Sequence, residues 1–384
     1  MFELVCDSCS RSYSGETTEW RCACGGRFSL TNEPRFSKEL IASDEHSLWR
    51  YGHVLPVSPQ FRLSLGEGWT PLLRRSFGGR EVRLKLDHLF PSGSYKDRGA
   101  AILMSKVKEL GIERVVEDSS GNAGAAVAAY AAGAGVTADI YVPAKNSPEK
   151  LAQVRAYGAR LVAVDGDRSA TAAAAWEAAE HTYYASHVYN PYFIEGTKTF
   201  AFEVWEQLGF QAPDTVVLPA GHGTLLLGSI KGFGELERAG LIEQVPRHVA
   251  VQSAACAPLA AAFAALNRSP AAGSTGGQAA RAGIETGTTV AEGIAITEPA
   301  MLSQMVDGIA GTGGRVITVE EADIARALRE AVRTGLFIEP TSAAALAGLE
   351  EYLSSAPEEE TVVSVVTGHG LKAAAKTAEL VESS

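Results

Sequence analysis

Cysteine is scarce in this chain, and long apolar segments are missing. Five of the 384 residues are cysteine, an odd number, and four of them lie within the first 24 residues. That distribution excludes the disulfide framework of a small secreted domain. No segment approaches the ~20 apolar residues of a membrane span, and the first residues lack the basic start and apolar centre of a signal peptide. We therefore expect a cytoplasmic protein with no membrane partner.

Basic residues are fewer than acidic ones. Lys and Arg number 34 against 45 Asp and Glu, which gives a formal net charge of −11. A nucleic-acid surface needs clustered Lys and Arg to displace counterions from phosphates, so we expect no nucleic-acid partner. Apolar residues make up 46% of the chain and charged residues 21%, as is typical of a globular protein. A small molecule is the partner that fits this composition.

Short β-branched segments alternate with alanine-rich helical segments through most of the chain. This alternation predicts an α/β protein with mostly parallel strands buried on both faces. A length of 384 residues exceeds the usual size of one hydrophobic core, so we expect two domains and a small appendage. The predicted strands are Val82–Leu86, Arg114–Glu117, Thr137–Val142, Arg160–Val164, Thr215–Leu218, His248–Gln252, Arg315–Val319 and Thr361–Val366, and the predicted helices include Ala123–Ala134 and Thr171–Ala179.

Four cysteines near the N-terminus have the spacing of a metal-binding knuckle. They are Cys6, Cys9, Cys22 and Cys24, in the pattern C-x2-C and then C-x-C, with two glycines directly after the second pair. Glycines let backbone amides turn close to the sulfurs, and a short module without its own core usually needs a metal to fold. We therefore predict a structural zinc bound by four thiolates. An exposed redox-active or unligated set of cysteines is the alternative.

A glycine-rich turn follows the predicted strand that ends at Leu218. It covers residues 219–224 and precedes a predicted helix over Leu225–Ile230. Helix N-termini present unpaired N–H groups, and Gly221 and Gly223 let the backbone approach an anion, so this turn is a candidate phosphate site. Leu226 stands where a dinucleotide fingerprint has its third glycine, which disfavours a nicotinamide dehydrogenase. An ordinary strand-to-helix connection is the alternative.

Lys96 stands where a helix should begin, just ahead of an apolar-periodic segment over Ala100–Leu110. An ammonium group at a helix N-terminus is electrostatically misplaced. A lysine that is covalently joined to an aldehyde cofactor avoids this penalty. An ordinary surface lysine is the alternative.

Several motifs occur together and in a fixed order. They are the cysteine knuckle, Gly66-Glu-Gly-Trp-Thr-Pro-Leu72, Ser94-Tyr-Lys-Asp-Arg-Gly99, Ser119-Ser-Gly-Asn122, Asn190-Pro191 with Glu195-Gly196, the glycine turn at 221–224, Glu339-Pro-Thr-Ser342 and Thr367-Gly-His-Gly370. In these motifs the sequence resembles threonine synthases, which belong to the tryptophan synthase β-like, fold type II class of pyridoxal-phosphate enzymes. The resemblance implies a pyridoxal-phosphate-dependent carbon–oxygen lyase that converts O-phosphohomoserine and water to threonine and phosphate.

The resemblance also implies roles for individual residues. Lys96 would hold the cofactor as a Schiff base and shuttle the α-proton, and Asn122 would hydrogen-bond the phenolic oxygen of the cofactor. Thr367 would meet the pyridine nitrogen, and because a hydroxyl does not keep that nitrogen protonated as a carboxylate would, the ring would be a gentler electron sink. The cofactor phosphate would bind at Gly221, His222, Gly223 and Thr224, and the amino-acid substrate at Ser94, Ser119, Ser120, Ala123, His187 and Phe193.

The same motifs give expectations for two further residues. Glu339 would either face the edge of the cofactor ring or begin a helix ahead of Pro340. His369 is expected to be a turn residue and not a catalytic base, because Lys96 already supplies one.

The resemblance further implies how the chain is divided. We expect a zinc-knuckle-like segment at 1–34, a large cofactor-binding domain at 35–85 and 190–384, and a small substrate domain at 86–189. Each domain would be a three-layer α/β/α structure, and the protein would form a homodimer. Residues 35–65 are expected to form an irregular arm and residues 267–281 a surface loop or lid.

The sequence departs from the family pattern where a substrate phosphate would bind. Threonine synthases commonly carry a hydroxyl residue where this chain has Ala123, and Asn-Ser-x-Asn-Pro-x-Arg where it reads His187-Val-Tyr-Asn-Pro-Tyr-Phe193. Val188 thus replaces a serine, and Phe193 replaces an arginine that would grip phosphate with two hydrogen bonds. The alternative function is therefore β-elimination or β-replacement on a serine or threonine derivative, unless Lys198, Arg98 or His187 compensates. A non-enzymatic zinc-ribbon binding protein is disfavoured by the acidic charge and the Lys96 and Asn122 motifs.

Overall fold

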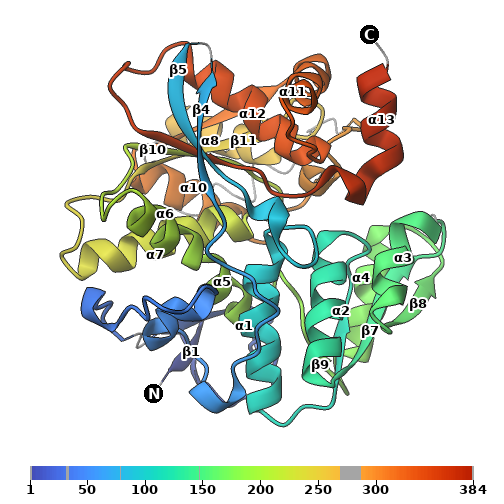
Figure 1. Ribbon diagram of the computed structural model, residues 1–384. Coiled ribbons are helices and arrows are strands. Elements are labelled where there is room, and N and C mark those ends of the chain that lie inside the picture. Colours follow the sequence, from blue (N-terminus) through green and yellow to red (C-terminus); the bar gives the residue numbers. More distant parts are fainter. Residues whose placement is uncertain (1, 32–33, 78, 147, 269–286, 383–384) are drawn as a thin grey trace. The chain divides into compact units, whose positions relative to one another are not determined.

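The computed structural model describes residues 2–31, 34–77, 79–146, 148–268 and 287–382. These residues form two compact units (Figure 1): unit 1 consists of Met1–Trp69 and Phe90–Thr199, and unit 2 of Thr70–Leu89 and Phe200–Ser384. Apart from its first two residues, the loop expected at 267–281 lies outside the described residues. Within the described part of the chain, no helix is both long and apolar enough to span a bilayer.

Unit 1 is built on a parallel four-stranded sheet. Its strands are β6 (Arg114–Glu117), β7 (Thr137–Pro143), β8 (Arg160–Val164) and β9 (Tyr183–Tyr184), in the order β8-β7-β6-β9. Helices α1 (Lys96–Glu109), α2 (Asn122–Ala134), α3 (Pro148–Ala156), α4 (Arg168–Ala178) and α5 (Pro191–Thr197) accompany it. Helix α2 is buried from Ala123 to Ala131, because its small side chains let it pack closely against β7 and α1.

The N-terminal part of unit 1 is a small antiparallel sheet followed by an arm. Strands β1 (Glu3–Cys6), β2 (Ser12–Ser14) and β3 (Phe28–Thr31) pair in the order β2-β1-β3. The arm expected to be irregular contains three short 3-10 helices, η1 (Lys38–Leu40), η2 (Leu48–Val54) and η3 (Pro59–Phe61). Trp49 of η2 lies in the core of unit 1, and its indole N–H donates to the Leu63 carbonyl at 2.9 Å.

Unit 2 is built on a six-stranded sheet in the order β12-β11-β10-β13-β5-β4 (Figure 1). Its strands are β4 (Leu72–Phe77), β5 (Arg80–Lys85), β10 (Thr215–Pro219), β11 (Arg247–Ser253), β12 (Arg315–Val319) and β13 (Val362–Val365). The edge strand β4 pairs antiparallel with β5, and the other pairings are parallel. Every residue of β10 and β13 is buried, as expected for strands covered on both faces.

Helices cover both faces of the unit 2 sheet. Helix α12 (Pro340–Leu353) packs on β10–β13, with α11 (Glu321–Arg333) and α13 (Ala374–Glu382) beyond it. Helices α7 (Thr224–Arg238), α8 (Pro258–Arg268) and α10 (Leu302–Gly311) pack against the same strands from the opposite side, and α6 (Thr199–Gln207) leads into the unit (Figure 1). Unit 2 is therefore a three-layer α/β/α structure.

The secondary structure predicted from the sequence is confirmed. Strands β6, β8 and β12 have the predicted bounds, and the other five predicted strands differ by two residues or fewer at either end. The expected α/β class with mostly parallel sheets is therefore confirmed.

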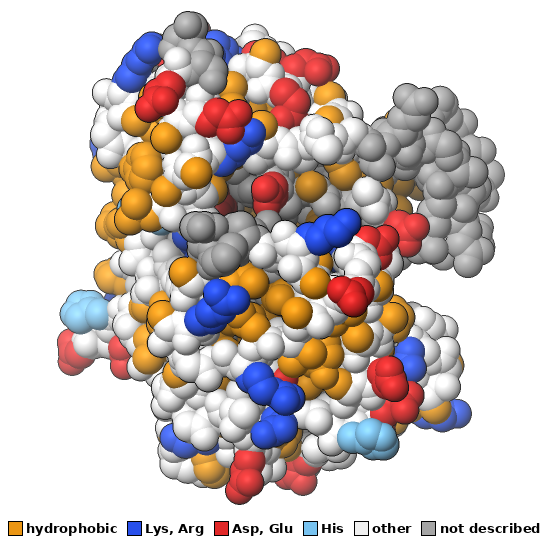
Figure 2. Space-filling model, turned by 90° about the vertical axis from the view of Figure 1, so that its right-hand side faces the viewer, with side chains coloured by type: hydrophobic (Ala, Val, Ile, Leu, Met, Phe, Trp, Pro, Cys, Tyr) orange, Lys and Arg blue, Asp and Glu red, His pale blue; other side chains and the backbone are white. Residues whose placement is uncertain are grey.

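On the face drawn in Figure 2, basic side chains are interspersed with acidic and apolar ones.

Candidate active site and cysteine cluster

Lys96 is the first residue of helix α1 in unit 1. The turn before the helix is fixed by Asp97, whose carboxylate accepts hydrogen bonds from the Ser92 hydroxyl and from the Ser92 backbone N–H, the latter at 2.7 Å. The Lys96 ammonium lies 4.8 Å from the centre of the Tyr95 ring and 5.6 Å from that of Phe193. Aromatic faces attract a cation at this range, so the structure holds the Lys96 nitrogen beside two rings.

Phe193 lies fully buried against the first turns of α1. A Cβ atom added at Gly99 would come within 2.3 Å of the Phe193 ring, so glycine at this position lets the ring lie on the helix backbone. The His187 ring meets Phe193 edge to face, with 5.9 Å between ring centres. Lys96, Phe193 and His187 thus form one group within unit 1.

A buried acid stands behind His187. Glu117 ends strand β6, and its Oε1 lies 2.7 Å from His187 Nδ1. Burial raises the pKa of Glu117 well above its usual range, the Asp118 carboxylate raises this pKa further, and the Lys96 charge opposes both. Burial therefore favours the neutral acid form of Glu117 over its carboxylate.

Among the described residues, two buried polar atoms related to Lys96 have no hydrogen-bond partner. One is near Lys96 in the sequence, and the other belongs to Glu117, whose carboxyl group interacts electrostatically with the Lys96 charge. They are the Ser94 hydroxyl oxygen, two residues before the lysine, and Glu117 Oε2. Buried polar atoms are normally paired, so these two indicate room for a polar ligand in unit 1. This observation fits the binding of an amino-acid substrate or a polar cofactor.

The N-terminus of α2 supplies a second set of polar groups in unit 1. Ser119 and Ser120 follow β6 after one residue, Asn122 is the first residue of α2, and Ala123 is buried behind it. A Cβ atom at Gly124 would come within 1.8 Å of the Ser119 carbonyl oxygen, so the chain turns tightly into the helix. Backbone N–H groups at a helix N-terminus favour an anion such as a carboxylate.

The glycine turn in unit 2 connects β10 to α7. Gly223 caps α7 with φ +86, and a Cβ atom there would come within 2.3 Å of the Met305 sulfur. A Cβ atom at Gly221 would lie 2.9 Å from the Gly293 carbonyl oxygen, so both positions need glycine. His222 is half-buried and Thr224 is buried. The turn leads straight into a helix N-terminus, which suits a phosphate group.

Thr367 follows the last strand of unit 2 and is buried in a hydrogen-bond network. Its hydroxyl lies 2.9 Å from the Ser342 hydroxyl and 3.0 Å from Glu339 Oε1. Glu339 caps α12 with Pro340 in the first helical turn, which confirms the helix-start interpretation of this residue. His369 begins the short helix η6 (Gly370–Ala373), and its ring accepts the Leu371 N–H at 3.1 Å, as expected of a turn residue.

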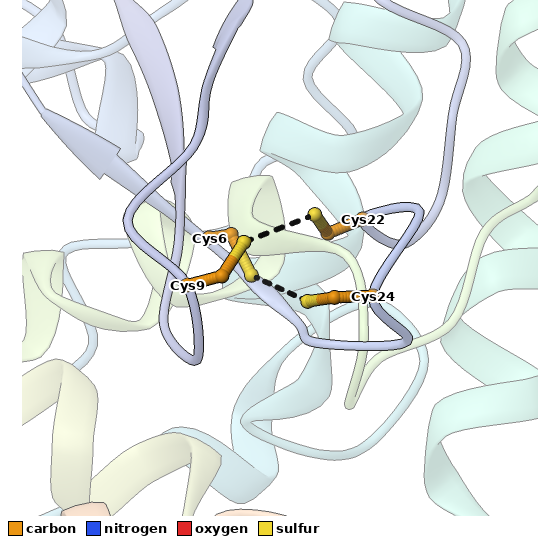
Figure 3. A group of neighbouring side chains, drawn as sticks. All are labelled: Cys6, Cys9, Cys22 and Cys24. Atoms are coloured by element: carbon orange, nitrogen blue, oxygen red, sulfur yellow. Dashed lines mark hydrogen bonds between the residues drawn. The ribbon is translucent and has the colours of Figure 1, made fainter.

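The four N-terminal cysteines meet in unit 1 (Figure 3). Their sulfur atoms all lie within 4.8 Å of one another, with 3.5 Å from Cys6 to Cys24 and 3.5 Å from Cys9 to Cys22. Four thiolates around zinc would be about 3.8 Å apart, so the donor set and its spacing fit this metal. The Cys24 backbone N–H and the Tyr13 hydroxyl lower the pKa of Cys22 to about 6. Against the lowering by the Gly26 backbone N–H, hydrogen bonds with Cys9, Cys6 and Cys22 raise the pKa of Cys24 to about 12, so the thiolate is favoured at Cys22 and not at Cys24.

An aromatic cluster joins the cysteine segment to the rest of unit 1. Trp20 meets Tyr184 and Tyr189 edge to face, with ring centres 5.1 and 5.3 Å apart. The Tyr184 hydroxyl donates to Asp118 at 2.7 Å, and the Tyr192 hydroxyl donates to the Gly15 carbonyl at 2.7 Å. The cysteine segment therefore supports the residues on either side of the Glu117–His187 dyad.

The sequence-predicted residues fall into two groups. Unit 1 contains Lys96, Ser94, Ser119, Ser120, Asn122, Ala123, His187 and Phe193, and unit 2 contains Gly221, His222, Gly223, Thr224 and Thr367. Sequence reasoning missed Glu117, and it named Ser342 only as part of a motif, without a role. Glu117 ends a strand two residues before Ser119, and a charged residue at the end of a buried strand is the signal that could have identified it.

Comparisons with known proteins agree with this arrangement. A family model described as pyridoxal-phosphate dependent enzyme matches residues 63–368. A threonine synthase of Methanocaldococcus jannaschii is 32% identical over 96% of this chain and 92% of its own length, and one of Synechocystis sp. is 36% identical over 84% and 82%. A fungal L-serine ammonia-lyase from Rhizomucor miehei superposes with a TM-score of 0.67 and 25% identity, covering 82% of this chain and 98% of its own. The predicted fold type II architecture is thereby confirmed, and the chain belongs to the threonine synthase family of pyridoxal-phosphate-dependent lyases.

Proposed function

We propose that this enzyme removes or replaces an uncharged β-substituent, such as a hydroxyl or an ester group, of a small amino acid of the serine or threonine type. The observation that carries this proposal is the buried Glu117–His187 dyad beside Phe193, where the family pattern has phosphate-binding residues. When bound, pyridoxal phosphate withdraws electrons from the α-carbon of an amino acid joined to it.

Different residues of this chain would bind the cofactor and the substrate. Lys96 would hold the cofactor covalently and then move the substrate α-proton. The amides of residues 221–224 would bind the cofactor phosphate, and Asn122 and Thr367 would hydrogen-bond its ring. The hydroxyls of Ser94, Ser119 and Ser120, with the amides at the start of α2, would bind the substrate carboxylate.

The groups around Lys96 would bind a phosphate on the substrate poorly. Of the cations that could replace the missing arginine, Lys198 is buried in an ion pair with Glu195 at 2.6 Å and also donates to the Val54 carbonyl. Arg98 is buried too, donates to the Thr199 hydroxyl at 3.0 Å and lies over the Phe90 ring. A phosphate dianion beside Phe193 and a buried carboxyl group would lack the charge compensation that burial demands.

The dyad suits a poor leaving group instead. Phosphate leaves as a stable anion, whereas a hydroxyl group leaves only when it receives a proton. Glu117 and His187 carry such a proton close to Lys96. The similarity to an L-serine ammonia-lyase supports the same chemistry.

Threonine synthesis from O-phosphohomoserine is the second candidate. The full-length similarity to threonine synthases favours it, since the 32% identity extends over 96% of the chain. In that case the enzyme would bind the substrate phosphate with groups other than the arginine of the family pattern.

The two candidates are separated by supplying the purified holoenzyme with L-serine, L-threonine, an O-acetylated serine and O-phosphohomoserine in parallel. We expect ammonia and a 2-oxo acid from one of the first three, and neither phosphate nor threonine from O-phosphohomoserine. Release of phosphate and threonine in equal amounts would instead establish the second candidate. Inactivity with all four, both alone and with sulfide added as the incoming nucleophile for replacement, in a protein that carries the cofactor, would exclude both.

We also propose that Cys6, Cys9, Cys22 and Cys24 bind a structural zinc ion. All four protein ligands are sulfur, which leaves no open position for a substrate and fits a structural role. The cysteine segment packs through Trp20 on Tyr184 and Tyr189. The metal would therefore hold one wall of the substrate-binding part of unit 1.

Removing this metal is expected to destabilise unit 1. A Cys9→Ser and Cys24→Ser double variant should lose one equivalent of zinc by elemental analysis and lower the thermal midpoint by on the order of 5 °C. A Cys256→Ser variant is the matched control, because Cys256 belongs to unit 2 and is not a member of the cluster. Equal zinc content in the double variant and the unsubstituted protein would contradict the assignment.

A further inference from the structure

We propose that the four N-terminal cysteines are also an oxidation site, at which a peroxide joins Cys6 to Cys24 and Cys9 to Cys22 in two disulfide bonds and releases the metal that they hold. The cluster would then alternate between a metal-bound state and a doubly cross-linked state. This inference goes beyond the structural role proposed for zinc, because it concerns what the same sulfur atoms do when an oxidant is present.

Each of these two pairs joins an exposed cysteine to a buried one. Cys9 and Cys24 are exposed, whereas Cys6 and Cys22 are only 1% and 2% exposed. A dissolved oxidant therefore reaches Cys9 or Cys24 first. A bound zinc ion would hold all four sulfurs as thiolates, so access, and not the acidity of each free thiol, would decide which sulfur reacts first.

Close contacts in the cluster run between the two halves of the cysteine motif (Figure 3). The Sγ atoms of Cys6 and Cys24 are 3.5 Å apart, and so are those of Cys9 and Cys22. A disulfide has about 2.05 Å between its sulfurs, and rotation about the Cα–Cβ bonds moves a sulfur by on the order of the difference. The two bonds would close loops between residues 18 and 13 positions apart, which removes conformational freedom from the unfolded chain.

Hydrogen bonds that do not involve a metal fix both turns that carry the cysteines. In the first turn, the Cys6 N–H donates to the Arg11 carbonyl at 3.0 Å, and the Ser10 N–H donates to the Cys6 carbonyl at 2.9 Å. In the second turn, the Cys22 N–H donates to the Gly26 carbonyl at 2.9 Å. Strand β1 ends at Cys6 and pairs with β3. The sulfur atoms therefore remain near one another when a metal leaves, and the disulfides form without rearrangement of the backbone.

The chemistry needs a peroxide as the oxidant. The exposed sulfur attacks one peroxide oxygen, so that an S–O bond forms, the O–O bond breaks, and hydroxide leaves and takes a proton from solvent. The buried sulfur then attacks the oxidised one, so that an S–S bond forms, the S–O bond breaks, and a second hydroxide leaves as water. Each pair thus gives two electrons to one peroxide molecule. Disulfide sulfurs carry no charge, so the metal loses its ligands and leaves as a divalent ion.

Hydrogen peroxide added to the purified holoenzyme tests the proposal. We expect about one equivalent of zinc to appear in a chromophoric chelator as about four thiols are lost, and dithiothreitol with added zinc to reverse both changes. Trypsin cleaves after Arg11, Arg21 and Arg27, so peptides 1–11 and 22–27 should be joined in the oxidised protein and separate after reduction. Tandem mass spectrometry of the joined peptides assigns the two bonds.

Several results would overturn this inference. Bonds from Cys6 to Cys9 or from Cys22 to Cys24 would leave the two peptides separate. Cysteines that are oxidised to sulfinic acid without a disulfide, or that survive the peroxide as thiols, would contradict it equally. A purified protein that contains no zinc but still forms the two expected bonds would overturn the metal assignment alone.

Two comparisons complete the experiment. Cys256→Ser is the matched control, because Cys256 is buried and is not a member of the cluster, so this variant should release zinc and join the two peptides at the unsubstituted rate. The oxidised protein should keep a thermal midpoint above that of the Cys9→Ser and Cys24→Ser double variant, since two disulfides replace the metal as cross-links. An oxidised protein that unfolds at the same temperature as the double variant would show that the bonds do not stabilise the segment and would contradict the doubly cross-linked state.

Discussion

Replacing Lys96 by alanine is expected to lower turnover of the enzyme's substrate by roughly 10³-fold or more, because the variant loses both the covalent attachment of the cofactor and the base that moves the α-proton. The Lys96 nitrogen lies beside the rings of Tyr95 and Phe193. The measurement combines steady-state rates with borohydride reduction and mass spectrometry of the labelled peptide. The unsubstituted enzyme should carry one reduced cofactor on the peptide containing residue 96, and the variant none.

Lys108→Ala is the matched control for this experiment. Lys108 belongs to the same helix but is exposed near its C-terminal end, so its replacement should change neither the rate nor the labelling. Full activity in Lys96→Ala, or a label on another lysine in the unsubstituted enzyme, would contradict the assignment of Lys96.

The strands that the sequence predicted well are those buried on both faces. Strand β10 has the sequence Thr-Val-Val-Leu-Pro and is buried throughout. A short apolar segment of this kind next to a glycine turn is typical of a buried strand. The edge strand β4 was missed, because its central Arg74 and Arg75 interrupt the apolar pattern. Its pairing with β5 depends on the neighbouring strand, which composition does not show. The arm at 35–65 was predicted as irregular from Pro and Ser, yet Trp49 anchors it in the core of unit 1.

The candidate site was predicted where a motif is continuous along the chain. Lys96 and Thr367 belong to short motifs whose order is fixed, so the family resemblance identified them. The Glu117–His187 dyad was not predictable, since its members lie 70 residues apart and meet only in the folded unit. The same holds for the network of Ser342, Thr367 and Glu339, because Thr367 lies 25 residues from Ser342 and 28 from Glu339 along the chain.

The Glu117→Gln substitution should separate a proton-donating role of the dyad from a structural one. We expect the rate of 2-oxo acid formation from the hydroxy amino acid that the enzyme uses to fall by about 10²–10³-fold, the usual contribution of a general acid. β-Chloroalanine should be processed within a few-fold of the unsubstituted rate, because chloride leaves without a proton. Glutamine preserves the shape of the side chain at the end of β6, and Glu113→Gln, on an exposed residue just before the same strand, is the matched control.

The pH dependence of the unsubstituted enzyme should also distinguish a proton-donating role of Glu117 from a structural one. Burial raises the pKa of Glu117 well above its usual range, so the acid form is lost only as the pH rises through this elevated value. The rate with the hydroxy amino acid should therefore fall on the alkaline side, and the rate with β-chloroalanine should not show that decline. In Glu117→Gln the alkaline decline should vanish from the profile of the hydroxy amino acid. If the substitution instead slowed both substrates equally and left the two pH profiles unchanged in shape, Glu117 would only position His187, and the proton for the leaving group would have to come from another residue.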